Sequence, residues 1–268
     1  MKEKVETVTI EWNGGNLACR WRPGKENPII FLHGICGSSA HFNTAFIDPS
    51  LCNHSLLAID LPGYGNSSPI SSWNLDLVGE AIKTAMEHFL DHKPWAVAHS
   101  ISSSVVIRLI KYLSGIILLE GNMIPQHLDF SDKVLKSKRH EYTKEYERIQ
   151  RASSMVLKYQ TYIKDNILLD YYSTTYALCS ADTVWDTANN CSNDIKDLEV
   201  IKRLSKLDFP VYCLYGAESN YKKSISDVKK VFPDMQLHTI TNSRHFPMID
   251  NPEETWRIVV NILRKIEK

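Results

Sequence analysis

Short runs of consecutive apolar residues recur along the chain, and each one ends at a polar residue or a glycine. They cover residues 28–32, 56–59, 95–98, 115–119, 209–215 and, less continuously, 235–240. Runs of this length without alternation are typical of strands that are buried on both faces of a parallel sheet. Segments with helical spacing lie between them, at 40–46, 75–90, 102–112, 222–231 and 253–265. The alternation predicts an α/β fold with a mostly parallel sheet and helices on both faces.

Two segments depart from this alternation. Near the amino terminus, residues 5–12 and 17–21 alternate apolar and polar side chains around Asn13-Gly14, which predicts an antiparallel hairpin at one edge of the sheet. From 122 to 207 the composition is charged, rich in tyrosine and helical in period, with no clear buried strand. We therefore predict a core domain made of residues 1–121 and 208–268, interrupted by a helical insertion at 122–207.

The charge and cysteine content exclude several classes of function. The 268 residues include 31 basic and 31 acidic side chains, so no overall field would attract nucleic acid or an anionic membrane. The charged amino terminus lacks the apolar core of a signal peptide and no segment is apolar enough to span a bilayer, which favours a cytoplasmic protein. The six cysteines form no Cys-x-x-Cys pair. We expect reduced thiols, no structural metal and no cofactor. No oligomeric state is indicated.

Several polar residues follow directly after the predicted strands. They are His33, Asp60, Ser100, Glu120 and the residues around Glu218. The carboxyl ends of parallel strands share one edge of the sheet, where ligands of such folds bind, so one crevice can collect all of them. Asp60 precedes Leu-Pro-Gly-Tyr-Gly, which is strong turn chemistry, and we assign it a structural role.

Ser100 lies where a predicted strand turns into a predicted helix. The surrounding Ala98-His99-Ser100-Ile101-Ser102 approximates Gly-x-Ser-x-Gly, in which a serine is held exposed on a sharp strand-to-helix turn. Small residues are needed two positions on either side of the serine because the two backbones approach closely. The hydroxyls of Ser102, Ser103 and Ser104 are expected to accept hydrogen bonds from free N–H groups of the first helical turn.

Four segments, in this order, resemble the α/β-hydrolase family. They are His33-Gly34-x-x-Gly37, Asp60-x-x-Gly63-x-Gly65-x-Ser67, Ala98-His-Ser100-Ile-Ser102 and His245-Phe-Pro-Met-Ile-Asp-Asn-Pro-Glu253. The resemblance implies an α/β-hydrolase sheet in which the insertion at 122–207 is a helical cap over the strand ends. It also implies that Ser100 is the nucleophile and His245 its base. The oxyanion hole would be formed by the backbone N–H groups of Ile35 and Ile101.

The acid that orients the histidine has two candidates. The family usually places it three residues after a glycine beyond the insertion, and that position here is Ser219, with Glu218 one residue early. A second family arrangement places the acid at the end of the strand before the cap, where this chain has Glu120. We favour Glu120 and keep Glu218 as the alternative, since both preserve the order serine, acid, histidine.

The resemblance predicts a serine hydrolase that cleaves an ester, thioester or related acyl bond of a small molecule through a Ser-His-Glu triad and an acyl-enzyme. A serine at position 100 argues against epoxide opening and halide displacement, for which relatives use an aspartate. Carbon–carbon bond hydrolysis or acyl transfer on the same triad is an alternative. Ala98 and Ser102 replace both glycines of Gly-x-Ser-x-Gly, and Ser219 stands at the usual acid position. These departures motivate another alternative: a non-catalytic or sensory ligand-binding protein with the same fold.

Overall fold

A single eight-stranded sheet runs through the computed structural model, which describes residues 4–151 and 153–266. The ends of the predicted core, 1–3 and 267–268, and residue 152 of the predicted insertion lie outside the described residues. The strand order is β1-β2-β4-β3-β5-β6-β7-β8. The strands are β1 (Glu6–Trp12), β2 (Gly15–Arg22), β3 (Glu26–Leu32), β4 (His54–Ile59), β5 (Trp95–His99), β6 (Gly115–Leu119), β7 (Val211–Gly216) and β8 (Gln236–Ile240).

The pairing of the strands follows the predicted pattern. β1 and β2 form the antiparallel hairpin at one edge, and β2 pairs antiparallel with β4. All pairs from β4 through β3 to β8 are parallel. The hairpin turns at Asn13 and Gly14, whose φ angles of 51° and 73° match the left-handed conformation that an Asn-Gly turn supplies. The prediction of a mostly parallel sheet is confirmed.

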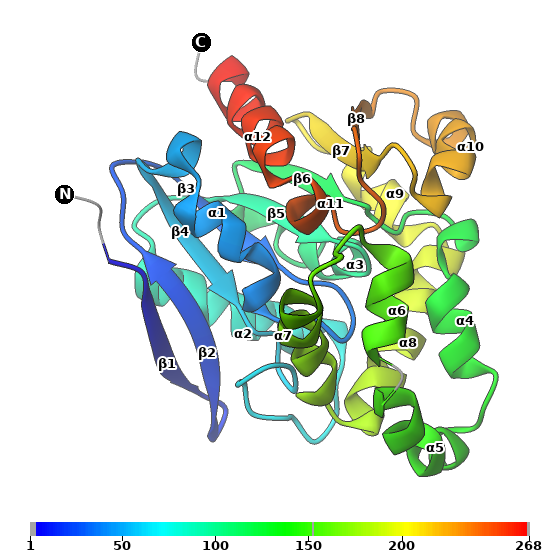
Figure 1. Ribbon diagram of the computed structural model, residues 1–268. Coiled ribbons are helices and arrows are strands. Elements are labelled where there is room, and N and C mark those ends of the chain that lie inside the picture. The colour runs from blue at the N-terminus through cyan, green and yellow to red at the C-terminus, as the bar shows by residue number, and fades with distance from the viewer. Residues whose placement is uncertain (1–3, 152, 267–268) are drawn as a thin grey trace.

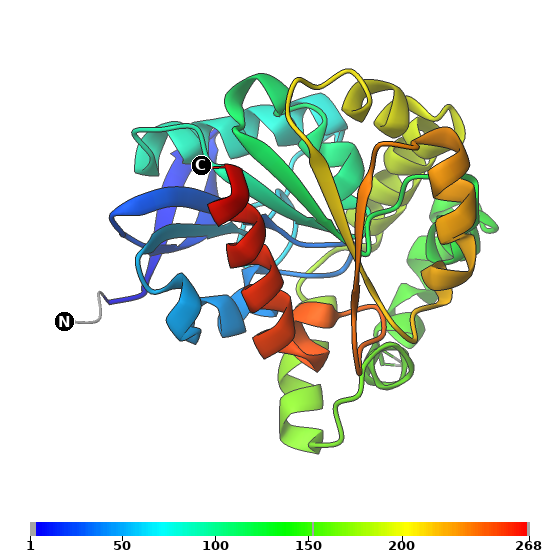
Figure 2. The ribbon, with the colours of Figure 1, turned by 90° about the horizontal axis from the view of Figure 1, so that it is seen from above.

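Helices cover both faces of the sheet (Figures 1 and 2). On one face lie α1 (Asn43–Ile47) and α12 (Pro252–Ile266), and on the other α2 (Leu75–Phe89) and α3 (Ser102–Val106). Phe31 of β3 contacts Trp256 of α12 edge-on, with 5.7 Å between ring centroids. Both rings are fully buried, so this contact is part of the core that fixes α12 on the sheet.

The described residues between β6 and β7 form helices joined by loops, with no strand among them, and we call this helical insertion the cap (Figure 1). Its helices are α4 (Asp129–Leu135), α5 (Arg139–Arg151), α6 (Ser153–Gln160), α7 (Asn166–Ala177), α8 (Ala181–Lys196) and α9 (Glu199–Leu204). The longest of them, α8, packs against α3, α4 and α5. The Tyr64 hydroxyl, in the loop after β4, donates a hydrogen bond of 2.7 Å to Thr187 of α8. The cap is thus attached to loops at the carboxyl ends of the strands.

One predicted helix is much shorter than its pattern. The segment 102–112 gives only α3, five residues long, followed by the 3-10 turn η3 (Ile110–Tyr112). Three serines and two β-branched valines make up α3, and all are poor helix formers, so tertiary contacts rather than propensity hold this turn.

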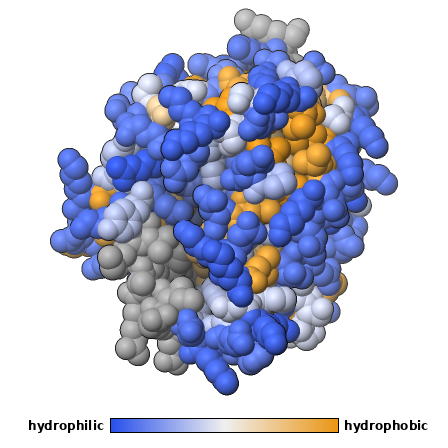
Figure 3. Space-filling view, turned by 90° about the vertical axis from the view of Figure 1, so that its right-hand side faces the viewer, coloured by the Kyte–Doolittle hydropathy of each residue, from blue (hydrophilic) through white to orange (hydrophobic). Residues whose placement is uncertain are grey.

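The hydropathy of the surface varies from place to place. The face at the right of Figure 1 is mostly hydrophilic, with apolar side chains gathered in its upper part (Figure 3). Among the helices that the structure describes, none is long and apolar enough to cross a membrane.

Candidate active site

The turn after β5 holds Ser100 in an unusual backbone conformation. Its φ angle is +56°, which few residues other than glycine adopt and which is typical of a strained serine at a strand-to-helix turn. A Cβ atom on Gly34 would lie 3.0 Å from the Ser100 Cβ, so the neighbouring loop needs a glycine to approach the turn this closely. Ala98 and Ser102 are both fully buried, so these small residues fill the two positions where the motif usually has glycine.

Two of the three serine hydroxyls of α3 donate to carbonyl oxygens, and the expectation that they accept from N–H groups is wrong for Ser102 and Ser103. Ser102 Oγ donates to the carbonyl oxygen of His33, and Ser103 Oγ donates to that of Asn122. The two acceptors belong to the segments that follow β3 and β6. Ser102 thus connects the strand-to-helix turn at Ser100 to the loop that contains Gly34.

The structure brings Ser100, His245 and Glu120 into one chain of contacts. Ser100 Oγ lies 3.2 Å from His245 Nε2, and His245 Nδ1 lies 3.3 Å from Glu120 Oε2. A carboxylate only accepts hydrogen bonds, so the proton of the neutral imidazole is on Nδ1 and Nε2 is free to accept the serine proton. Both distances fit the geometry required of a nucleophile, its base and the group that orients the base.

Glu120 is fully buried, and the described hydrogen bonds of its carboxylate are all with donors. Its Oε1 accepts from the backbone N–H of Gly216 at 2.6 Å, and its Oε2 accepts from Ser219 Oγ at 2.5 Å and from His245. A buried carboxylate requires such partners to remain charged. Glu120 has a φ of +51°, a second strained position at the end of a strand. The residue at the usual acid position, Ser219, therefore serves as a donor to the carboxylate.

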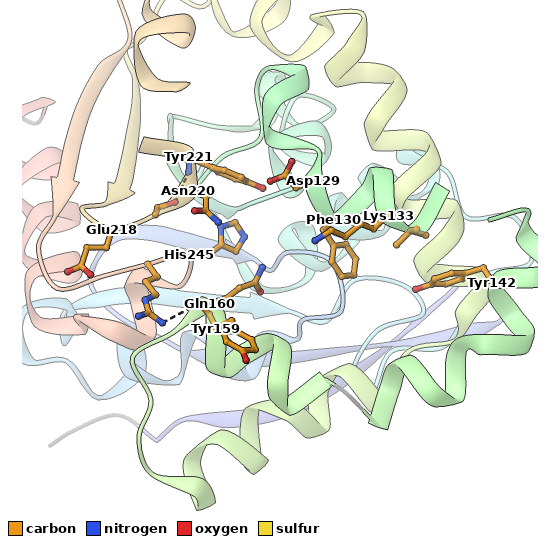
Figure 4. A pocket seen from close by; sticks show the side chains of 13 residues that line it. Asp129, Phe130, Lys133, Tyr142, Tyr159, Gln160, Glu218, Asn220, Tyr221 and His245 are labelled. Atoms are coloured by element: carbon orange, nitrogen blue, oxygen red, sulfur yellow. Dashed lines mark hydrogen bonds between the residues drawn. The ribbon is translucent and has the colours of Figure 1, made fainter. Parts of the chain in front are cut away.

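Glu218 lies apart from the imidazole. It is exposed, and its carboxylate points away from His245 in Figure 4. Of the two acids that the sequence left open, the structure places Glu120 beside His245.

The loop of His245 is held from the core and from the cap. His99 Nε2 donates to the carbonyl oxygen of His245 at 2.8 Å, and the N–H of His245 donates to the carbonyl of Gln160, at the end of α6, at 3.1 Å. Burial lowers the pKa of His99 well below its usual value, which keeps this ring neutral. The main chain of His245 is thus hydrogen-bonded at both its N–H and its carbonyl group.

Asp250 joins the same two segments. Its carboxylate accepts from the N–H of Tyr162 at 2.7 Å and from the N–H of Arg244 at 2.8 Å. Burial raises the pKa of Asp250 to about 7, an effect that the Arg244 amide and charge oppose. The Arg244 guanidinium adds hydrogen bonds to the carbonyls of Tyr159 and Thr161 and lies over the Tyr162 ring at 4.4 Å.

A small cavity of about 30 Å³ lies at the serine. It is lined by Ile35, Ser100, Ile101, Asn122 and His245 together with Gly34, His99, Phe130, Ser131, Gln160, Tyr221 and Phe246. Ile35 and Ile101, the predicted oxyanion-hole residues, thus border the same space as the serine and the histidine. Cys36, next to Ile35, is buried with a φ of +58°, so it fills a tight turn.

A larger cavity of about 530 Å³ adjoins His245 (Figure 4). Phe130 and Lys133 of α4, Tyr159 and Gln160 of α6, and Asn220 and Tyr221 of the 3-10 helix η5 (Asn220–Ser224) surround it. Asp129, Val134, Tyr142, Glu218, Ser219 and Arg244 complete its lining. The cap and the loop after β7 therefore form a mixed apolar and polar chamber large enough for a small molecule.

Two polar strand-end residues have structural contacts. The Asp60 carboxylate accepts from the N–H groups of Ser39 and Asn66 at 2.6 and 2.9 Å, which holds the turn after β4. His33 Nε2 accepts from the N–H of Leu61 at 3.0 Å, and its Nδ1 donates to the carbonyl of Gly34 at 2.8 Å. Burial lowers the pKa of His33, so the ring ties two loops together as a neutral group. In the described part of the chain no cluster of three His, Cys, Asp or Glu could hold a metal ion.

The sequence reasoning missed Asn122, Gln160 and Asp250. Asn122 follows Glu120 by two residues at a predicted strand end, a position that could have drawn attention to it. Gln160 acts through its backbone carbonyl, so no sequence signal marks it. Asp250 lies inside the segment 245–253 that was matched as a whole, with no separate role assigned to it.

A profile of the alpha/beta hydrolase family matches residues 29–258, most of the chain and all of the site described above. The chain belongs to the alpha/beta hydrolase family. The predicted fold class and family are therefore confirmed.

Three similar proteins have between 16% and 23% sequence identity to this chain. A 2-succinyl-6-hydroxy-2,4-cyclohexadiene-1-carboxylate synthase from Enterobacter sp. (strain 638) is 22% identical over 255 residues, which cover 88% of this chain and 91% of that protein. A candidate aryl esterase from Burkholderia cenocepacia superposes with a TM-score of 0.78 at 23% identity, covering 98% of both chains. A thermophilic esterase from Thermogutta terrifontis gives 0.75 at 16% identity, covering 99% of this chain and 100% of its own. At these identities the solved structures establish a shared fold.

Proposed function

We propose that this alpha/beta hydrolase is a serine hydrolase that cleaves an ester, thioester or related acyl bond of a small molecule. The observation that carries the proposal is the unbroken chain from Ser100 Oγ through His245 to the buried Glu120 carboxylate, next to a cavity that borders Ile35 and Ile101. In this proposal residues 122–207 are the cap and the 530 Å³ chamber beneath it receives the substrate. The esterases among the similar structures agree with this reaction class.

Acylation uses the three side chains in sequence. His245 Nε2 takes the Ser100 proton while Oγ bonds to the acyl carbon, and Glu120 stabilises the imidazolium that results. The N–H groups of Ile35 and Ile101 receive the negative charge that develops on the acyl oxygen. The intermediate collapses as the bond to the leaving group breaks, and the leaving group takes the proton from Nε2. An acyl group remains on Ser100 Oγ.

A fluorophosphonate probe tests this assignment directly. We expect it to label the wild-type protein, with the adduct mapped to the peptide that contains Ser100, and to leave Ser100→Ala unlabelled. Hydrolysis of p-nitrophenyl esters of graded chain length should fall by about 10⁶ in kcat in Ser100→Ala. Folded wild-type protein that neither reacts with the probe nor cleaves any ester would identify a non-catalytic binding protein instead. Product analysis on carbon–carbon bond substrates separates that activity from ester cleavage.

A further inference from the structure

The side chain of Asn122 lies next to the hydroxyl of the proposed nucleophile. It follows β6 directly after Glu120 and Gly121, and its side chain is 4% exposed. Its Oδ1 lies 3.4 Å from Ser100 Oγ, long for a bond between two oxygen atoms but within reach of the hydroxyl. None of the acylation steps above uses this residue.

The surroundings fix which end of the Asn122 amide points to Ser100. Its Nδ2 donates to the carbonyl oxygen of His127 at 2.9 Å, so Oδ1 is the end turned to the serine. The main-chain N–H of Asn122 donates to the carbonyl of Ser100 at 3.1 Å. His127 is itself held, because its Nδ1 accepts from the N–H of Met123 at 3.2 Å and its ring stacks on Tyr221 at 4.4 Å.

Two acceptors therefore surround one hydroxyl hydrogen. His245 Nε2 and Asn122 Oδ1 lie 3.2 and 3.4 Å from Ser100 Oγ, and a serine hydroxyl supplies only one hydrogen. Once Oγ carries an acyl group it has no hydrogen left, and both acceptors are open. A water molecule offers two hydrogens. Both residues also line the 30 Å³ cavity, which exceeds the 10–15 Å³ or so that one water requires.

We propose that Asn122 is a catalytic residue for deacylation, whose Oδ1 binds and orients the water that hydrolyses the acyl-enzyme. One hydrogen of this water is directed to His245 Nε2 and the other to Asn122 Oδ1, so that a lone pair of its oxygen faces the acyl carbon. His245 takes the first proton as the water oxygen bonds to the acyl carbon. The bond from the acyl carbon to Ser100 Oγ then breaks, Oγ recovers the proton from Nε2, and the carboxylic acid leaves with the second hydrogen. The inference rests on the proposed serine hydrolase function.

The test separates the two half-reactions with p-nitrophenyl acetate. Rapid-mixing kinetics report acylation as a burst of p-nitrophenol and deacylation as the later rate, while intact-mass spectrometry follows the acetyl adduct. In Asn122→Ala we expect a burst within about three-fold of the wild-type rate. Deacylation should be slowed by about 10- to 100-fold, as for the loss of one positioning hydrogen bond. The acetyl adduct should accumulate on Ser100.

Two further variants test whether the effect comes from the lost acceptor or from a change in the fold. Asn122→Leu keeps much of the side-chain volume without an acceptor and should give the same selective defect. Ser103→Ala removes a hydrogen bond to the Asn122 carbonyl but leaves the amide side chain, and it should deacylate within about three-fold of wild type. Wild-type deacylation in either Asn122 variant, or equal slowing of both half-reactions, overturns the role of Asn122. If the wild-type protein forms no acetyl adduct and resists fluorophosphonate, the proposed function itself fails.

Discussion

The N–H of His245 donates to the carbonyl oxygen of Gln160 at 3.1 Å, so the proposed catalytic base is hydrogen-bonded directly to the end of a cap helix. Asp250 reinforces this contact by accepting from the N–H groups of Tyr162 and Arg244. The main chain of His245 is therefore held in part by the helical segment between β6 and β7, through the last residue of α6.

Replacement of Asp250 should loosen this connection. In Asp250→Ala the N–H groups of Tyr162 and Arg244 lose their acceptor, and we expect kcat to fall by about ten-fold as the histidine becomes less well placed. Amide hydrogen exchange at residues 159–163 should quicken in parallel. Asp234→Ala, at an exposed aspartate, is the matched control and should change neither. Faster exchange without any loss of kcat would show that the cap contact does not position the base.

The two candidate acids differ sharply in their contacts with His245. Glu120→Ala should lower kcat by about 10³ to 10⁴, as for the loss of orienting acids in other triads, whereas Glu218→Ala should stay within about two-fold. Steady-state kinetics on one p-nitrophenyl ester measure both variants under the same conditions. A large effect in Glu218→Ala together with a small one in Glu120→Ala would contradict the assignment.

Ser219 offers a way to move the acid. Its hydroxyl lies 2.5 Å from Glu120 Oε2, the oxygen that faces His245, so a carboxylate on this residue would occupy nearly the same space. We expect Ser219→Asp in a Glu120→Ala background to recover at least about ten-fold in kcat over Glu120→Ala alone. Ser219→Asn in that background is the uncharged control and should recover much less. Equal recovery by both would mean that charge at this place is unimportant.

Acid should destabilise the protein through its buried histidines. Burial lowers the pKa of His127 to about 4 from 6.5, and His33, His41 and His99 are lowered for the same reason. Since these side chains take up protons below pH 6.5 in the unfolded chain but not in the folded protein, the contribution of these histidines to stability is full above that pH and is lost as the pH falls toward 4. One unit of pKa corresponds to about 1.4 kcal/mol, so His127 alone accounts for roughly 3 kcal/mol at the acid end.

Urea unfolding between pH 4 and 8 measures this dependence. His127→Gln should be less stable than wild type at pH 8 and should lose less stability on acidification. His140→Gln replaces an exposed histidine and should follow the wild-type curve. An acid dependence that is unchanged in His127→Gln would place the proton uptake on other groups.

The sequence by itself determined the fold class, the hairpin, the helical insertion and the family. These features depend on residues that are close together in the chain: an apolar run indicates a strand buried on both faces, and the residues that follow it indicate the turn. It also singled out Ser100, His245 and two acids. It could not decide between Glu120 and Glu218, since their distances to His245 depend on how β6, β7 and the loop after β8 are placed side by side. Asn122, Gln160 and Asp250 emerged only from the tertiary structure. Their contacts join segments far apart in the chain, several through backbone atoms that are the same in every residue, and local patterns contain no record of such contacts.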